Sequence, residues 1–482
     1  MSRAAKAPTG PQPRAKDDAP ADRSRPSFVL RVGRVGVGLL AVLAIGLAVS
    51  VTAWHLLEGS PNVAEASAAV PASFDVDELL ILVDADMAAT AYADGILHPI
   101  PDTHDGLYAL SGDALDVENV SPASNSVAGW PGSLAVDPRR RLAYVIEVKA
   151  PVGRSRERVE SVYEGFGNGR RLAAIDLEEG RVARTVTACP ALRSIDLAPG
   201  AGWLLAACGT RQSELTVIPL DDAGLPGAPR PLDLPLEELA TQPRDRGATY
   251  AAVHPAGAAA AVIQANRAVH LIRFERDAAG VPVESTLEPG AAQDAWLTVA
   301  RWTRTGDHLL VSDVGWGPSP VSAVFNGPGA ILSFALSPDD DRRGLVSRAE
   351  VSRSPEAFEM DRTGSLLAVV NMERTYLPSG LLSLVPGRGA SSLSLVSVDD
   401  RTGTLRTLGP PVGFRGVLPE DVAFDRDGDQ LAVVVFQDHD DPRSAGWLEL
   451  FAVDRSGDEP RVARTGRRIP LPRGGHDLVA VY

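Results

Sequence analysis

The stretch Phe358-Glu-Met-Asp361-Arg-Thr-Gly364-Ser-Leu366-Leu-Ala-Val-Val370 decides the fold class of this chain. An apolar segment, a polar turn and a second apolar segment follow one another within it. Gly364 supplies the positive φ angle that a tight hairpin turn requires. The stretch therefore predicts an antiparallel β-hairpin.

The same hairpin pattern recurs five more times along the chain, at residues 134–146, 195–207, 250–263, 299–311 and 422–435. Further strand-like segments follow these hairpins, at residues 172–176, 182–186, 269–274 and 393–398. A unit is therefore predicted to contain four antiparallel strands, which is the composition of a propeller blade. One or two β-sandwiches are the alternative, and six hairpins in register argue against it.

The two ends of the chain carry strands that lack a complete hairpin. Residues 477–482 form a strand with nothing after it, and residues 79–83 and 95–100 form strands with no hairpin before them. We expect these segments to share one blade, because such closure removes the exposed edges of an open array. The prediction is an all-β, seven-bladed β-propeller over residues 75–482, with eight blades as the alternative.

Two stretches carry a resemblance to a known family. His254-Pro255-Ala-Gly257, followed by residues 260–266 and 269–274, is similar to the repeat of the YVTN and lactonase-like (WD40-like) propeller superfamily, and residues 358–371 resemble it too. The resemblance implies a seven-bladed ring. It is a resemblance of fold, because the superfamily includes sugar lactonases, dehydrogenase chains and proteins without known activity.

The N-terminal region differs from the rest in composition. Residues 1–34 are rich in Ala, Pro, Arg and Ser and carry a net charge of +5, whereas the whole chain carries −15, so residues 35–482 carry −20. Residues 35–57 are uncharged and long enough to cross a bilayer core of about 30 Å. By the positive-inside rule we expect a disordered cytoplasmic tail (1–34), a signal-anchor helix (35–57), a linker (58–74) and an exported propeller. A cleaved signal peptide ending at Ala66-Ser67-Ala68 is the alternative.

This organisation limits the classes of partner that the protein is expected to bind. We expect a single-pass membrane protein whose propeller is periplasmic or at the cell surface, with the membrane as one partner and an envelope protein or glycan as another. The acidic exported part has no basic stripe, which argues against nucleic acid.

The candidate site lies where long loops gather on one face of the predicted ring. The turns between the second and third strands of the blades are the long ones, and antiparallel order places them all on one face. The links that enter the inner strands converge at the mouth of the central channel on that face. The predicted binding residues are Trp130, Arg193, Arg246, Trp296, Glu356, Asn371, Arg374, Glu420, Asp421 and His439.

Two further groups of residues have a specific chemistry. His98, Asp102 and His104 are weak candidates for a metal site, because His and Asp ligate divalent cations but their spacing matches no known site. Cys189 and Cys208 flank one hairpin at nearly opposite positions, so an oxidising compartment would favour a disulfide between them.

Two functions remain open at this point. The first is a binding module that recognises a protein, a glycan or an envelope component. The second is a lactonase-like hydrolase in which Glu356 or Glu420 acts as base or metal ligand and Arg193 holds the substrate, with a divalent cation as cofactor. A dehydrogenase subunit that needs a partner chain is a weaker third.

Overall fold

The computed structural model divides the chain into two compact units, Met1–Leu56 and Leu57–Tyr482. The residues that the structure describes are 45–47, 49–50, 61–69, 73–85, 105–123, 129–150, 167–200, 202–210, 213–232, 234, 236, 247–290, 293–317, 320–339, 341–377, 385–438 and 445–482. The predicted tail and most of the predicted anchor lie outside these residues. Within them, no helix is long and apolar enough to cross a membrane.

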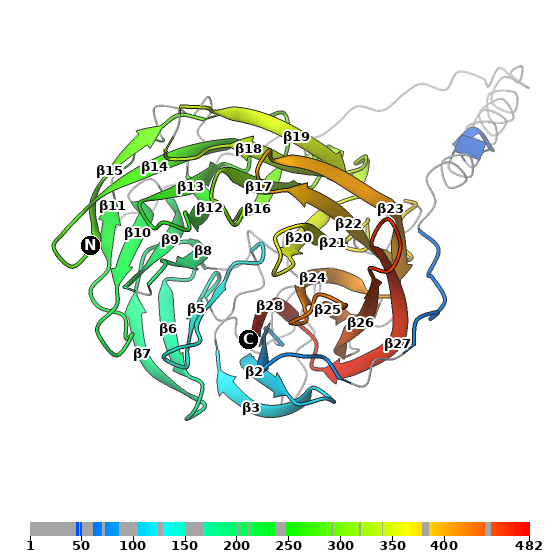
Figure 1. Ribbon diagram of the computed structural model, residues 1–482, viewed down its shortest axis with the longest axis horizontal. Coiled ribbons are helices and arrows are strands. Elements are labelled where there is room, and N and C mark those ends of the chain that lie inside the picture. Colours follow the sequence, from blue (N-terminus) through cyan, green and yellow to red (C-terminus); the bar gives the residue numbers. More distant parts are fainter. Residues whose placement is uncertain are drawn as a thin grey trace, which may run out of the picture. The chain divides into compact units, whose positions relative to one another are not determined.

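The described strands of the second unit form seven four-stranded antiparallel sheets arranged around a central axis (Figure 1). The first strand of each blade lies nearest the axis. Blades 1 to 3 comprise β4 (Leu134–Asp137), β5 (Leu142–Ile146), β6 (Arg171–Asp176) and β7 (Arg181–Thr187); β8 (Leu192–Leu197), β9 (Trp203–Thr210), β10 (Ser213–Pro219) and β11 (Arg230–Leu232); and β12 (Ala248–Val253), β13 (Ala259–Gln264), β14 (Ala268–Arg276) and β15 (Pro282–Glu288).

Blades 4 to 6 continue the same order along the chain. They comprise β16 (Leu297–Trp302), β17 (His308–Asp313), β18 (Ala330–Ala335) and β19 (Gly344–Glu350); β20 (Pro355–Met360), β21 (Leu366–Asn371), β22 (Ser391–Asp399) and β23 (Thr404–Phe414); and β24 (Val417–Phe424), β25 (Gln430–Gln437), β26 (Gly446–Asp454) and β27 (Arg461–Leu471).

Blade 7 combines both ends of the chain. Its inner strand is the C-terminal β28 (Gly475–Val481), and the N-terminal β1 (Glu78–Val83), β2 (Gly106–Ser111) and β3 (Asp116–Pro122) complete it. β28 and β1 pair antiparallel, with Glu78 opposite Val481 and Ile81 opposite Leu478. The predicted pairing of the two chain ends in one blade is therefore confirmed, and the ring has seven blades rather than eight. The predicted strand 95–100 lies outside the described residues.

The hairpin turns show why the sequence pattern folds as it does. In blade 5 the Asp361 carboxylate accepts hydrogen bonds from the main-chain N–H groups of Ser365 (3.0 Å) and Leu366 (3.1 Å). Gly364 adopts a φ angle of 77° within that turn. Aspartate at the start of a turn satisfies main-chain donors that the ladder leaves free, and glycine supplies the left-handed conformation.

The core lies between neighbouring blades. Second strands such as β13 and β25 are buried along their whole length, whereas the outer strand β3 is mostly exposed. Each sheet packs both faces against its neighbours, so its central strands are continuously apolar rather than alternating. This stack of sheets is the rigid scaffold of the channel.

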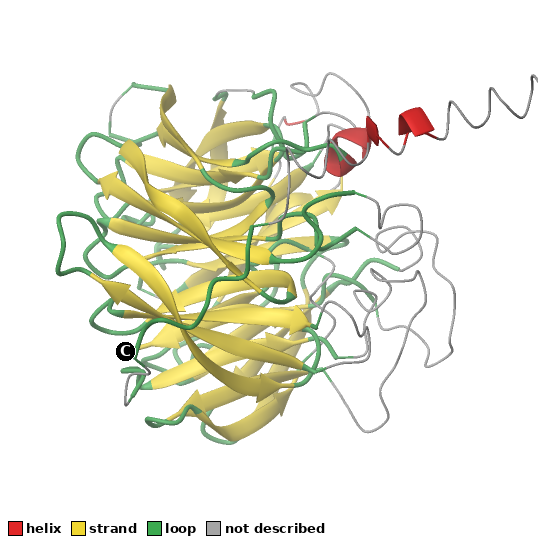
Figure 2. Ribbon diagram, turned by 90° about the vertical axis from the view of Figure 1, so that its right-hand side faces the viewer, coloured by secondary structure: helices red, strands yellow, loops and turns green. Residues whose placement is uncertain are grey.

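The connections between the second and third strands begin and end on one face of the ring, as predicted. The one after β17 carries the short helix α3 (Pro320–Val324). Figure 2 shows the strands side-on, with the C-terminus on the opposite face. We call the face with the long connections the insertion face and the other the turn face.

Part of the predicted linker packs against the propeller. The N–H of Ala64 donates to the carbonyl oxygen of Gly413 (2.9 Å), and Arg464 Nη1 donates to the carbonyl oxygen of Ala64 (2.6 Å). A Cβ atom at position 413 would lie 2.3 Å from the carbonyl oxygen of Asn62, so only glycine allows this approach. Residues 61–69 therefore contact the outer strands of blades 5 and 6 rather than forming a free linker.

Cys189 and Cys208 form a disulfide, with their Cα atoms 6.2 Å apart. The bond joins the link that enters β8 to the neighbouring strand β9. Closing a loop of this size is worth about 3 kcal/mol in the chain-entropy model.

Candidate functional site

The inner strands share a local irregularity near the channel mouth on the insertion face. In four blades the pairing register of the inner strand skips one residue near its start: Arg193 in β8, Thr249 in β12, Glu356 in β20 and Glu420 in β24. In β16 and β28 the same shift falls within Thr298–Val299 and His476–Asp477. We call these positions the bulge ring. Bulges redirect side chains and are frequent beside functional sites.

A residue with a positive φ angle precedes most of these bulges. Ala191, Ser354 and Leu418 adopt positive φ angles of 56°, 51° and 51°, each two residues before a residue of the bulge ring. Gly247 and Gly474 do the same before Thr249 and His476. Non-glycine residues pay roughly 1–3 kcal/mol for this conformation, and such strain clusters at functional sites.

Glu356 and Glu420 are the chemically unusual members of the ring. They occupy equivalent positions on adjacent inner strands, and each is preceded by proline. Both are almost fully buried, at 3% and 4% exposure. Burial raises both pKa values well above the usual range; the charge of Asp421 adds to the effect on Glu356, and that of Glu356 to the effect on Glu420. Both carboxyls therefore favour the protonated form more than an exposed glutamate does.

The next blade supplies a cation beside this pair. His476 Nε2 lies 4.0 Å from Glu420 Oε2, and His476 Nδ1 lies 3.0 Å from Asp477 Oδ2. Burial lowers the pKa of His476, but the charge and hydrogen bond of Asp477 outweigh it and raise the pKa to about 9. His476 is therefore an imidazolium at neutral pH.

Asp421 and Asp477 connect consecutive inner strands. Asp421 Oδ2 accepts a hydrogen bond from the N–H of Leu478 (3.0 Å). Asp477 accepts bonds from the N–H groups of Gly132 (2.6 Å) and Ser133 (3.0 Å). Burial, and next the charge of Asp477, raise the pKa of Asp421 to about 8. These two carboxyls join blades 6, 7 and 1.

Large side chains from several blades lie at the channel axis beside these carboxyls. Arg301 Nη1 donates a hydrogen bond to the Tyr250 hydroxyl (2.5 Å), and Arg301 Nε lies 3.7 Å from Glu359 Oε2. A Cβ atom at Gly132 would lie 2.8 Å from the Tyr250 ring. Side chains from blades 3, 4 and 5 therefore meet one another and the main chain that leads into blade 1.

Four aromatic rings gather near the carboxyl pair. The Trp316 ring lies 5.6 Å from Trp130, 6.1 Å from Trp296 and 5.0 Å from Tyr376, measured between ring centroids. Trp130 lies in the link that enters blade 1, and Trp316 lies in the β17–β18 connection of blade 4, so their contact crosses the channel mouth. We call these four residues the aromatic cluster.

The structure places the predicted binding residues in different environments. Trp130 and Trp296 belong to the aromatic cluster. Glu356, Glu420 and Asp421 are buried close to one another on strands β20 and β24. Arg193 occupies the bulge ring on the far side of the channel, beside Lys149, whose pKa is lowered by burial and then by the charge of Arg193.

Asn371 and Arg374 are buried and bonded within the protein. Asn371 Nδ2 donates to the hydroxyls of Ser392 and Ser394, both at 3.1 Å. Arg374 donates to the side-chain and main-chain oxygens of Asn326, at 2.9 and 2.6 Å. Asn371 therefore joins strand β21 to β22, whereas Arg374 joins the insertions of blades 4 and 5, and both side chains are buried.

The remaining predicted residues lie outside the described part of the chain: Arg246, His439, His98, Asp102 and His104. Among the described residues, no three His, Cys, Asp or Glu side chains form a group that could hold a metal ion. The described channel residues therefore do not fit the divalent cation expected for a lactonase-like site.

Four channel residues escaped the sequence analysis: Tyr250, Arg301, His476 and Asp477. A signal for two of them existed, because His476-Asp477 starts the last inner strand in the position that Glu420-Asp421 occupies one blade earlier. Tyr250 and Arg301 lie within regular strands and resemble ordinary core or surface positions in sequence.

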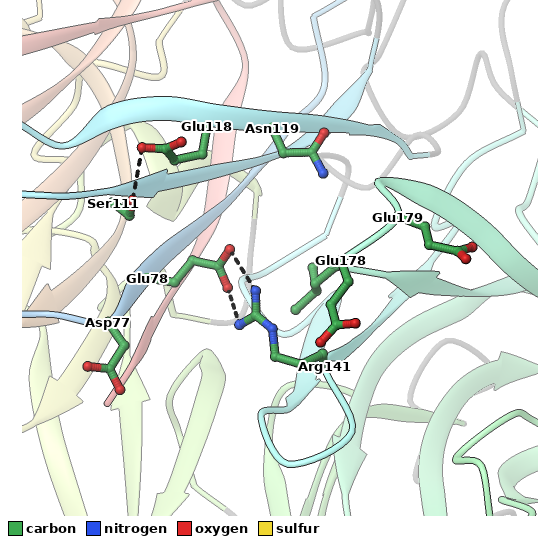
Figure 3. A pocket seen from close by; sticks show the side chains of 9 residues that line it. Asp77, Glu78, Ser111, Glu118, Asn119, Arg141, Glu178 and Glu179 are labelled. Carbon is green, nitrogen blue, oxygen red and sulfur yellow. Dashed lines mark hydrogen bonds and ion pairs between the residues drawn. The ribbon is translucent and has the colours of Figure 1, made fainter.

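A separate acidic groove lies on the turn face between blades 7 and 1 (Figure 3). Its volume is 710 Å³, and Asp77, Glu118, Glu178 and Glu179 are among its lining residues. Arg141 spans it and donates to Glu78 at 2.7 and 3.3 Å. The groove lies on the face opposite the bulge ring.

Comparisons with known proteins agree with the fold. No family model matches the sequence, and no curated protein matches it. Solved structures do match. A periplasmic gluconolactonase from Pseudomonas aeruginosa has a TM-score of 0.55 at 16% identity, covering 84% of this chain and 99% of that one.

Two Bacteroides structures, both provisionally named 6-phosphogluconolactonases, are similar to the same degree. The Bacteroides uniformis protein has a TM-score of 0.54 at 13% identity over 84% of this chain, and the Bacteroides fragilis protein 0.55 at 12% over 86%; each is covered completely. This chain shares the seven-bladed propeller fold of these structures. At such identities the similarity concerns the fold alone.

Proposed function

We propose that this protein is a hydrolase of a cyclic ester of the sugar-lactone class, and that Glu356 and Glu420 are its acid and base. One observation carries the proposal. Glu356 Oε2 is buried and has no hydrogen-bond partner among the described residues, although it lies beside a second carboxyl. A buried polar atom without a partner is costly and requires an explanation, such as a ligand, a bound water or a catalytic role.

The proposed mechanism uses the two carboxyls as a pair that shares a proton. Two adjacent buried carboxyls do not both ionise readily, so one is a base while its neighbour is an acid. The ionised carboxyl takes a proton from water, whose oxygen attacks the ester carbonyl carbon. The ring C–O bond then breaks, and the protonated carboxyl gives its proton to the leaving alkoxide oxygen. The product is an open-chain hydroxy acid.

His476 supplies positive charge in this mechanism. Its imidazolium lies beside Glu420 and is oriented by Asp477. A fixed cation stabilises the ionised form of the base and the negative charge that develops on the carbonyl oxygen. The aromatic cluster would form an apolar wall for the faces of a sugar ring.

We further propose that the propeller works outside the cytoplasm and is held by residues 35–57. The Cys189–Cys208 disulfide supports an oxidising compartment. The charge asymmetry around residues 35–57 supports a cytoplasmic N-terminus. An envelope saccharide would then be the natural source of the ester.

The test is hydrolysis of a panel of sugar lactones by the full chain in detergent, with the spontaneous rate subtracted. We expect turnover by the native protein and a loss of at least about 100-fold in kcat for Glu356→Gln and Glu420→Gln. Glu359→Gln is the matched control, because it lies on the same strand and is ion-paired at a partly exposed site. Full activity in Glu356→Gln would refute the mechanism.

A binding module remains the second candidate. The aromatic cluster at the channel mouth favours it, because indole rings bind sugars without any reaction. Saturable binding of a lactone or glycan that is never hydrolysed, weakened by Trp316→Ala, would support this function in place of the first.

A further inference from the structure

A short turn of the blade 5 insertion lies behind both carboxyls. Residues Met372–Tyr376 follow strand β21, and all of them are buried. We call this segment the 372–376 turn. Its position is notable because it contacts the inner strands of two successive blades.

The first contact reaches the strand that carries Glu356. The N–H of Met372 donates to the carbonyl oxygen of Ser354 (2.9 Å), and the Ser354 hydroxyl donates to the Tyr376 hydroxyl (3.4 Å). Burial raises the pKa of Tyr376 to about 12, and the nearby charge of Glu356 contributes. The turn therefore forms hydrogen bonds with Ser354, the residue of positive φ two positions before Glu356.

The second contact reaches the strand that carries Glu420. The N–H of Leu418 donates to Thr375 Oγ1 (3.2 Å), and Thr375 Oγ1 in turn donates to the carbonyl oxygen of Met372 (2.8 Å). Leu418 is the equivalent of Ser354, with the same φ angle of 51°. Adjacent side chains of one turn thus hold the two equivalent bulges.

The turn itself is rigidly held. Arg374 binds both oxygens of Asn326, and its Nη1 donates to the carbonyl oxygen of Pro386 (3.0 Å). Asn326 Nδ2 closes the network by donating to the Ser354 hydroxyl (2.7 Å). A side chain locked by such bonds can fix the geometry of its neighbours.

We propose that Thr375 and Tyr376 are positioning residues that fix Glu356 and Glu420 relative to one another. The inference rests on the proposed function, since it explains how the acid and the base keep the separation that lets them share a proton. Thr375 acts through the main chain of Leu418, and Tyr376 acts through the hydroxyl of Ser354 rather than through its ring in the aromatic cluster.

The test compares Thr375→Val and Tyr376→Phe with the native full chain. Two readouts are used: the pH profile of kcat for lactone hydrolysis, and the titration of the Glu356 and Glu420 carboxyls followed by NMR of 13C-labelled glutamate. Gln variants assign the two signals. The titratable or charged groups that face the carboxyls are Asp421, Asp477, His476 and Tyr376.

We expect kcat to fall at least about tenfold in each variant while KM changes less than about threefold, because an acid–base pair that is displaced loses transition-state stabilisation. The two carboxyl titrations should also move closer together. Thr375→Ser keeps the hydroxyl and should restore native values.

Tyr144→Phe is the matched control. Its hydroxyl donates to the carbonyl oxygen of Gly224 (2.7 Å) in a buried site in blade 1, so it loses a similar bond far from the carboxyls. We expect it to leave both readouts unchanged. Unchanged titrations in both Thr375→Val and Tyr376→Phe would overturn the proposal. If the native protein hydrolyses no lactone, the proposed function fails, and the NMR titrations still decide whether this turn positions the carboxyls.

Discussion

Glu449 and Glu356 are both buried glutamates on the same propeller, and their surroundings are opposite. Glu449, on the outer part of blade 6, accepts hydrogen bonds from Arg464 Nε (3.0 Å), Arg468 Nε (2.6 Å) and Trp447 Nε1 (3.0 Å). Glu356, at the channel, has an oxygen without any partner among the described residues.

The difference separates a structural carboxylate from a reactive one. A buried charge is tolerated when cations and donors surround it, and it then holds its neighbours in place. A buried carboxyl without a cation stays protonated and is ready to exchange its proton. Arg464, which is bonded to Glu449, also donates a hydrogen bond to the carbonyl oxygen of Ala64 in segment 61–69. Glu449 therefore stabilises the packing of this segment on the outer strands.

The largest expected effect is on stability at Glu449. Glu449→Gln removes the charge but keeps the shape, which leaves the largely buried Arg464 without its counterion. Breaking one partner of a buried ion pair costs about 3–5 kcal/mol. The measurement is urea unfolding at pH 7. The partly exposed Glu359 is the control, and its Gln variant should lose less than about 1 kcal/mol. A similar loss in the two variants would show that the buried ion pairs of Glu449 stabilise the fold no more than an exposed pair does.

The opposite change is expected at Glu356. Its pKa is raised in the folded protein, so the folded state binds more protons than the unfolded state once the pH exceeds about 4. Stability therefore falls as the pH rises through the window between these two pKa values. Glu356→Gln removes this loss, and we expect it to be more stable than the native protein by at least about 1 kcal/mol at pH 8.

The pH dependence is what distinguishes this effect from a general change in packing. At pH 4.5 the folded carboxyl is protonated and the unfolded one is still about half protonated, so most of the advantage of Glu356→Gln should disappear. Thermal unfolding at both pH values measures it. An equal gain at pH 4.5 and pH 8 would show that the carboxyl does not titrate abnormally.

The fold was predictable because its signals are local. Each hairpin combines an apolar segment, a turn with aspartate or glycine and a second apolar segment, and this pattern survives without any knowledge of distant contacts. The closure of blade 7 followed from strands left without partners at both ends. Residues 61–69 were predicted as a linker. Their contacts with Gly413 and Arg464 join positions about 350 to 400 residues apart, and no local pattern in the sequence indicates such contacts.

The site was predictable in part for the same reason. Glu356 and Glu420 stood out because Pro-Glu repeats at equivalent positions, and Trp130 and Trp296 because the links converge on one mouth. Arg374 and Asn371 are polar loop residues in sequence, and only the tertiary packing of the insertions shows that they are buried. Tyr250 and Arg301 meet because strands of neighbouring blades converge at the axis, which no local pattern records.

The smallest expected effect concerns Arg468, the more exposed partner of Glu449. Its guanidinium lies 4.4 Å from the centre of the Trp447 ring, but 35% of its side chain is exposed. Arg468→Ala therefore loses a screened ion pair and a cation–π contact while Arg464 still neutralises Glu449, and we expect a loss of about 1 kcal/mol. Arg468→Lys keeps the charge but not the flat stacking geometry, so it should recover only part of this loss. Urea unfolding at low and high salt separates the two contributions, because salt weakens the ion pair more than the ring contact. A loss as large as that of Glu449→Gln would mean that Arg468, rather than Arg464, neutralises the buried carboxylate.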